Sequence, residues 1–228
     1  MHQTTSKNRD GAQLFINNWA PSLFFLISIL VHLRLSDYAF DDAYIHFRIS
    51  QNFVSHGYPY YNLGDATMVT SSPIWTMLLS TIFFIFGNNL CSVAILNGVI
   101  LVLAALTWGN LISEKVSFLK TIIIAALLSV SSFGLMETPL ALLFLGIGTF
   151  LDKRNDSRAF IFLTLAFFTR FELGIFLILF LIKHWQGRRF SKAAIYTFVT
   201  SLPIITFCFH YFATLTPNTI SAKSIVYN

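Results

Sequence analysis

The sequence has few charged residues. Only 11% of its 228 residues are Asp, Glu, Lys or Arg, whereas 55% are hydrophobic, and a soluble domain usually carries about 25% charged residues. This shortage excludes an ordinary water-soluble globular protein. Phenylalanine, in contrast, occurs 25 times, often within long apolar runs such as 23–31, 122–130 and 175–182. Because such runs are typical of helices surrounded by lipid, we expect an integral membrane protein.

Cysteine is also scarce, and no continuous basic patch is present. Cys91 and Cys208 both lie in apolar segments, where a small buried side chain is a more common role than a disulfide. The formal charge is +5, but the basic residues form short clusters between apolar runs, which indicates topology signals rather than a nucleic-acid-binding surface. The first apolar run leads into His32 and Arg34 without a small-residue cleavage site. We therefore interpret it as a retained helix.

Six apolar segments are long enough to cross a membrane, alone or with tilt. They are residues 19–35, 91–112, 118–136, 138–151, 159–182 and 193–213. The segment 159–182 is expected to form two short helices that break near Arg170. Another segment, 73–87, is bracketed by Pro73 and Gly87 and is shorter than the roughly 20 residues of a straight crossing. The expected fold class is all-α and polytopic.

The basic clusters test this arrangement. If 73–87 stays at the membrane surface and 159–182 crosses twice, every cluster falls on the side of the N-terminus, as the positive-inside rule requires. The clusters are Lys7 with Arg9, Lys115 with Lys120, Lys153 with Arg154 and Arg158, and Lys183 with Arg188, Arg189 and Lys192. We therefore predict seven crossings, with a cytoplasmic tail at 1–18, a transmembrane domain at 19–215 and an outer segment at 216–228. Residues 36–72 form an outer loop with juxtamembrane helices.

The outer loop 36–72 is the long polar stretch in which we expect the chemistry. It contains Asp41 and Asp42 at the start of a predicted short amphipathic helix. Capping is the structural role of such acids, but a cap needs one carboxylate rather than two. Two adjacent carboxylates repel each other, so that one can be a better base for a hydroxyl proton. Asp41, Tyr44 and Arg48 share a helix face, where an Asp41–Arg48 ion pair is the simple alternative.

Other polar residues are expected on the same side of the membrane. Glu137, and Arg170 with Glu172, lie near apolar segments, where charges are expensive and usually have a partner or a function. A structural pair of Arg170 with either acid is the alternative. The aromatic stretch 56–65 either stacks on a sugar or rests at the interface, and 70–72 is expected to cap the helix 73–87, with Trp75 as an interfacial anchor. Together these sites predict an outer pocket for a lipid-linked phosphate, which three basic side chains could bind. They are Arg48, Arg170 and Lys223.

Five short blocks follow one another along the chain. They read Asp-Asp-Ala-Tyr-Ile-x-Phe-Arg at 41–48, Ser-Ser-Pro-Ile-Trp-Thr at 71–76, Met-Glu-Thr-Pro-Leu at 136–140, Thr-Arg-x-Glu at 169–172 and Pro-Asn-Thr-Ile-x-Ala-Lys at 217–223. In this order, over roughly residues 19–225, the chain resembles the GT-C superfamily of membrane glycosyltransferases. Within it, the chain looks most like the mycobacterial-type terminal arabinofuranosyltransferase branch.

The resemblance implies transfer of a sugar from a polyprenyl-phosphate donor to a hydroxyl of a glycan, lipid or protein acceptor, with inversion. It also implies a bacterial plasma membrane with the active site on the outer, periplasmic face. Asp41 would be the base, and Asp42 a second carboxylate that orients substrate or, with Asp41, binds Mg²⁺ or Ca²⁺. The substrate-binding residues would be Tyr44, Arg48, Glu137, Arg170, Glu172, Asn218 and Lys223.

The chain departs from the family pattern at two places. Relatives usually read Thr-Arg-Pro-Glu-Gly where this chain has Thr-Arg-Phe-Glu-Leu-Gly at 169–174, and they continue with more helices beyond the position of Asn228. Two alternatives therefore stay open. One is a transporter or flippase for a lipid-linked sugar, although the sequence shows no internal repeat and its acids lie at the outer edge. The other is a non-catalytic fragment that needs a partner chain with the missing helices.

Overall fold

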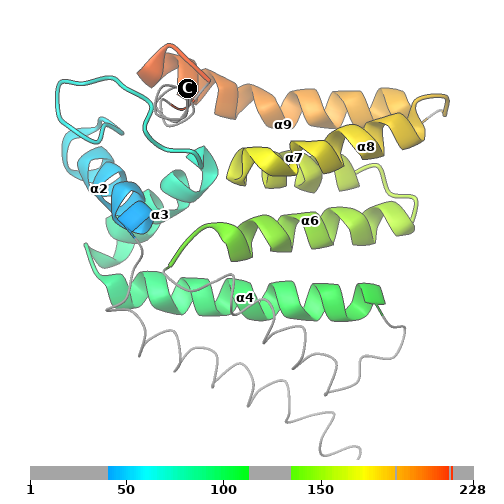
Figure 1. The fold of residues 1–228 in the computed structure, drawn as a ribbon, viewed down its shortest axis with the longest axis horizontal. Coiled ribbons are helices and arrows are strands. Elements are labelled where there is room, and N and C mark those ends of the chain that lie inside the picture. The colour runs from blue at the N-terminus through cyan, green and yellow to red at the C-terminus, as the bar shows by residue number, and fades with distance from the viewer. Residues whose placement is uncertain (1–40, 113–134, 188, 216, 218–228) are drawn as a thin grey trace, which may run out of the picture.

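The computed structural model describes residues 41–112, 135–187, 189–215 and 217, and this part of the chain is built from helices (Figure 1). They are α2 (Asp41–His56), α3 (Pro73–Phe86), α4 (Leu90–Ile112), α6 (Thr138–Lys153), α7 (Ala159–Thr169), the 3-10 helix η1 (Phe171–Leu173), α8 (Gly174–His184) and α9 (Arg189–Phe212). Because the described residues contain no strand, the predicted all-α class is confirmed for them. The predicted segment 19–35 and most of 118–136 lie outside the described residues.

The longer helices lie side by side, and α2 and α3 lie at one end of them (Figure 1). Helix α6 packs between α4 and α7, and α7 in turn packs against α9. Helices α2 and α3 pack mainly against each other, while α3 also contacts α4, α7 and α9. The loops before α3 and α6 and the turn after α7 therefore come together at the end where α2 lies.

The predicted break near Arg170 is confirmed. Arg170 has an extended backbone, with φ −145° and ψ 113°, and it ends α7. The rings of Phe160 and His184 lie 6.0 Å apart, so the start of α7 is beside the end of α8, and the two helices are antiparallel. Gly174 allows this reversal, because a Cβ there would lie 2.8 Å from the ring of Phe167. The chain thus turns back on itself at the end where α2 lies.

Among the described residues, two helices are long and apolar enough to cross a membrane. They are Leu90–Leu111 and Arg189–Phe212, and they correspond to the predicted segments 91–112 and 193–213. Helix α3 has 14 residues and is about 21 Å long, which is shorter than the about 30 Å of hydrocarbon in a bilayer. Helices α7 and α8 have 11 residues each. The seven crossings therefore stay a prediction.

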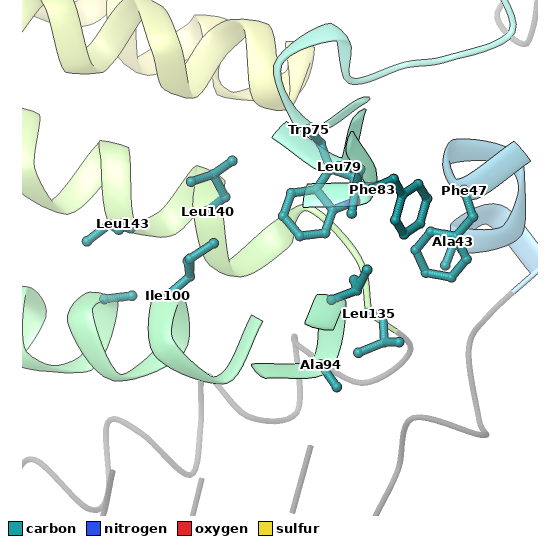
Figure 2. Close-up of a cluster of buried hydrophobic side chains, with 12 residues drawn as sticks. Ala43, Phe47, Trp75, Leu79, Phe83, Ala94, Ile100, Leu135, Leu140 and Leu143 are labelled. Atoms are coloured by element: carbon teal, nitrogen blue, oxygen red, sulfur yellow. The ribbon is translucent and has the colours of Figure 1, made fainter. Parts of the chain in front are cut away.

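A buried apolar cluster joins α2 and α3 to the other helices (Figure 2). Trp75, Leu79 and Phe83 of α3 pack with Phe47 of α2 and with side chains of α4 and α6. Trp75 is fully buried, so the expected role as an interfacial anchor is wrong, because its ring fills this core. Helix α3 begins at Pro73 as predicted, but Ser72 makes no side-chain cap.

The opposite end of the bundle is tied together by Asp152. This buried carboxylate of α6 lies 2.6 Å from Lys183 Nζ, 2.8 Å from His184 Nε2 and 3.3 Å from Arg189 Nη1. These contacts link α6 to the end of α8 and the start of α9. The end of α6, the end of α8 and the start of α9, with Lys153, Lys183 and Arg189, consequently lie at the end of the molecule opposite α2 and α3 (Figure 1).

Candidate functional site

A cavity of about 360 Å³ opens at the end of the bundle where α2 lies. Its walls come from α2, from the loop before α3, from the loop before α6, from the turn between α7 and η1, and from the segment after α9. The lining residues are Asp42, Ile45, His46, Val69, Ser71, Met136, Glu137, Arg170, Phe171, Glu172 and Pro217. Each of the five sequence blocks thus contributes at least one residue to the same cavity.

The acidic pair stands at the start of α2. Asp41 is the first residue of the helix, and its side chain lies outside the described part of the structure. Asp42 is exposed and lines the cavity. The location of Asp42 agrees with a role at the site, whereas the roles of Asp41 as a base and of both acids as metal ligands stay predictions. Among the described side chains, no three His, Cys, Asp or Glu residues lie together as a metal site would require.

Glu137 is a buried carboxyl group at the wall of the cavity. It precedes α6, and only 3% of its surface is exposed. Its Oε1 lies 3.8 Å from Nη1 of Arg170, and its Oε2 lies 3.7 Å from Nε2 of His46. Oε2 has no hydrogen-bond partner among the described residues. Burial raises the pKa of Glu137 above its ordinary value, and the nearby charges of Glu172 and Asp42 also raise it, whereas a backbone hydrogen bond and Arg170 lower it.

His46 is a site residue that the sequence did not identify. It is 3% exposed, and its Nδ1 lies 3.2 Å from Oγ1 of Thr70 and 3.3 Å from Oγ1 of Thr76. Burial lowers the pKa of His46 to about 4, so its imidazole is neutral at neutral pH. One signal could have identified it, because His46 follows Asp42 by four residues and shares its face of the helix.

Arg170 is the permanent cation among the described lining residues. Its Nη1 donates a hydrogen bond to Oγ1 of Thr138 at 2.6 Å, and its Nη2 lies 3.4 Å from Oε1 of Glu172. Both structural pairs considered from the sequence are therefore present, with Glu172 in closer contact than Glu137. Phe171, which replaces the usual proline of the family pattern, lines the cavity. The guanidinium is held in place at the cavity while about a third of the side chain stays exposed.

Two other predicted binding residues, Tyr44 and Arg48, are not brought to this cavity. Tyr44 and Arg48 line a separate pocket on another face of α2. Nε of Arg48 donates a hydrogen bond to the carbonyl oxygen of Tyr61 at 2.9 Å, and its guanidinium lies 4.7 Å from the Tyr61 ring. Arg48 therefore secures the loop after α2. Asn218 and Lys223 lie outside the described residues, although the buried Pro217 lines the cavity.

Comparisons of the chain with protein-family models, with curated proteins and with solved structures found no match.

Proposed function

We propose that this chain is a multi-pass membrane glycosyltransferase that takes its sugar from a polyprenyl-phosphate donor. The acceptor is a hydroxyl group on the non-cytoplasmic face, and the reaction proceeds with inversion. The product belongs to a cell-envelope glycan or glycolipid. The proposal starts from the resemblance of the five sequence blocks to GT-C glycosyltransferases, and the cavity supplies its structural support.

The observation that carries the proposal is the meeting of all five blocks at one cavity. Their lining residues are separated by up to 175 positions, from Asp42 to Pro217, and nothing in their sequence spacing requires them to meet. A cavity with carboxyl groups, one arginine and apolar side chains suits a ligand that carries both a phosphate and a sugar. Its volume of about 360 Å³ falls within the range of small-molecule sites.

The proposed reaction needs a base and an anion-binding group on the same cavity. The carboxylate of Asp41 takes the proton of the acceptor hydroxyl, and the hydroxyl oxygen forms a bond to the anomeric carbon. The bond from that carbon to the phosphate oxygen breaks, and its electron pair leaves with the polyprenyl phosphate. In the proposed reaction Arg170 binds the phosphate oxygens, since a guanidinium offers several donors in a plane.

The proposed membrane arrangement rests on the apolar helices and on the basic end of the bundle. Helices α4 and α9 are the two described helices with sufficient length and apolarity. In addition, α8 and α9 expose many large apolar side chains that suit lipid. These include Ile175, Ile178, Leu179, Ile182, Ile195, Phe198, Val199 and Leu202. The end with Asp152, Lys183 and Arg189 would face the cytoplasm, since Lys and Arg favour that side. The cavity would then face outward.

Release of free polyprenyl phosphate tests the proposed function. Membranes that contain the chain are incubated with a panel of polyprenyl-phosphate sugars and a mixture of acceptors, and the released lipid phosphate is measured. We expect release by the native chain and a loss of at least about 100-fold in Asp41→Asn, in line with the usual contribution of a general base. Asp156→Asn is the matched control, because Asp156 pairs with Arg158 at the other end of the bundle.

The experiment has three possible outcomes. Release that depends on Asp41 but not on Asp156 supports glycosyl transfer and identifies the donor. If the Asp41→Asn variant releases polyprenyl phosphate at the native rate, the assignment of the base is wrong. If no donor is consumed by the native chain, the proposed activity of this chain is rejected.

A further inference from the structure

The hydrogen bonds of His46, Thr70 and Thr76 beside the cavity show which ring nitrogen of His46 carries the proton. The hydroxyl of Thr76 donates to the carbonyl oxygen of Ser72 at 3.0 Å, which commits its one proton. In the 2.9 Å contact between the hydroxyls of Thr70 and Thr76, Thr70 must therefore be the donor, and its proton is committed as well. The two contacts of His46 Nδ1 with these hydroxyls then require a proton on Nδ1.

The proton on Nδ1 determines what His46 presents to Glu137. A neutral imidazole with its proton on Nδ1 has a lone pair on Nε2, and burial keeps His46 neutral by lowering its pKa to about 4. The lone pair faces Oε2 of Glu137 at 3.7 Å, and this oxygen has no hydrogen-bond partner among the described residues. An ionised carboxylate would place two buried acceptors against each other, which is unfavourable in a site with little water.

We propose that His46 Nε2 and Glu137 Oε2 share one proton, and that the neutral pair is the surface on which a phosphate group binds in the cavity. The second half of this proposal rests on the proposed function, whereas the first half depends only on the contacts and burial of His46 and Glu137. A movement of about 0.7 Å would bring the two atoms from 3.7 Å to the about 3 Å of a hydrogen bond.

The charges around the cavity explain why a neutral Glu137 would favour the binding of an anionic phosphate. Asp42 and Glu172 also line the cavity, and Arg170 is the permanent cation among its described residues. If Glu137 were ionised as well, the three carboxylates among the described lining residues would oppose one guanidinium, and an anionic phosphate would be repelled. A Glu137 that shares a proton with His46 removes one negative charge from the cavity, which weakens the repulsion of a phosphate that Arg170 binds. No titratable side chain comes from α3, whose residues are all uncharged.

The shared proton can be detected without any ligand. An infrared spectrum of the purified full-length chain at neutral pH should show the carbonyl stretch of a protonated carboxylic acid. This band should vanish in Glu137→Gln and persist in Glu172→Gln, the matched control on a largely exposed carboxyl group. His46→Asn, which can keep the contacts to Thr70 and Thr76 but lacks Nε2, should shift the loss of the band to lower pH. The absence of a Glu137-dependent band from the native chain would overturn the proposal.

Binding of phosphate tests the second half. Polyprenyl phosphate and inorganic phosphate are each titrated into the native chain and into Glu137→Gln over a range of pH. Because burial raises the pKa of Glu137, the affinity of the native chain should fall as pH rises through that pKa, by up to about tenfold per pH unit. Glu137→Gln should not show this fall. The ratio between the two proteins at each pH removes the contribution of the phosphate's own ionisation.

The outcomes distinguish the shared proton from the phosphate site, and a lipid phosphate from a free phosphate. Binding of both ligands with the Glu137-dependent fall supports a general phosphate site, and binding of the lipid alone supports a lipid phosphate site. An identical pH dependence in Glu137→Gln, or no binding by either ligand, would show that the phosphate does not bind on this pair. The infrared band would still test whether His46 and Glu137 share a proton. The release of polyprenyl phosphate from sugar donors would still test the proposed function.

Discussion

Thr76 stands at the centre of the polar contacts that hold His46. Its hydroxyl contacts Ser72, Thr70 and His46 in a buried part of the molecule. A polar group that loses its buried partner typically costs about 1–3 kcal/mol of stability. The position of the imidazole beside Glu137 therefore depends on Thr70 and Thr76, which contact the ring but do not line the cavity.

We predict that Thr76→Val lowers the free energy of unfolding by about 1–3 kcal/mol. The expected loss is much larger than in Thr81→Val, which should stay within about 0.5 kcal/mol of the native chain. Both threonines belong to α3, and each donates to the carbonyl oxygen four residues earlier, but Thr81 is exposed. Thermal unfolding of both variants in the same detergent compares them. Equal losses would contradict the buried role of Thr76.

The sequence identified several residues of the site but not how they meet. Glu137 and Arg170 are predictable because charges near apolar segments usually have a partner or a function. Asp42 is predictable because it belongs to a pair of adjacent carboxylates in the polar loop. The contact between His46 and Glu137 joins residues 91 positions apart, and no local pattern predicts such a pairing. Arg48 was expected to bind phosphate from its charge alone, yet its place on α2 turns it toward Tyr61. Tertiary packing, which spacing does not reveal, decides both cases.

At the scale of elements, the close approach of α6 and α7 depends on Gly148. A Cβ at this position would lie 2.8 Å from Cγ of Leu163 and 3.2 Å from the backbone oxygen of Ala159. The side chain of Leu163 is fully buried, and the backbone of α7 can move away only with the whole helix. Because α7 also packs against α9, a larger side chain at Gly148 would disturb three helices.

We predict that Gly148→Ala destabilises the chain by about 1–3 kcal/mol, the usual effect of overpacking a well-packed interior. Gly187→Ala is the control, because a Cβ there meets its nearest neighbour at 3.5 Å, which is an ordinary contact. The melting temperatures of the two variants are measured by thermal unfolding. A melting temperature of Gly148→Ala as high as that of Gly187→Ala would show that α6 and α7 do not approach as closely as described.

Helix boundaries were more predictable than the surroundings of the helices. Pro73 has no backbone N–H, and it therefore favours the first turn of a helix, where α3 begins. Arg170 interrupts the apolar run 159–182, which indicates the end of α7. The burial of Trp75 could not, since an aromatic side chain near an expected interface suits either lipid or a protein core. The cluster of α2, α3, α4 and α6 around Trp75 exists only once the chain is folded.

At the scale of the whole molecule, the two ends differ in chemical character. One end carries the cavity with its carboxyl groups, and the other gathers Asp152, Lys183, His184 and Arg189. Such a difference along the axis of a helix bundle suits a protein that crosses a membrane in one orientation. The orientation itself is part of the proposed function.

We predict that the two ends are accessible from opposite sides of the membrane. In a background without Cys91 and Cys208, single cysteines are placed by Ser55→Cys in the exposed end of α2 and by Ser157→Cys in the loop before α7. A membrane-impermeant thiol reagent added to intact cells should label Ser55→Cys, and it should label Ser157→Cys only after the membrane is opened. Labelling of Ser157→Cys in intact cells would overturn the proposed orientation, and equal labelling of both would reject the crossing.

The antiparallel pair of α7 and α8 has a consequence for biosynthesis. At 11 residues each, both helices are about 16 Å long, roughly half the thickness of the hydrocarbon layer. Each helix alone is therefore too short to enter the bilayer from a translocation channel as a complete transmembrane segment. In the proposed membrane arrangement, residues 159–184 therefore have to leave the channel together as a hairpin, after the ribosome has completed α8 and made Lys183 and His184 available to Asp152.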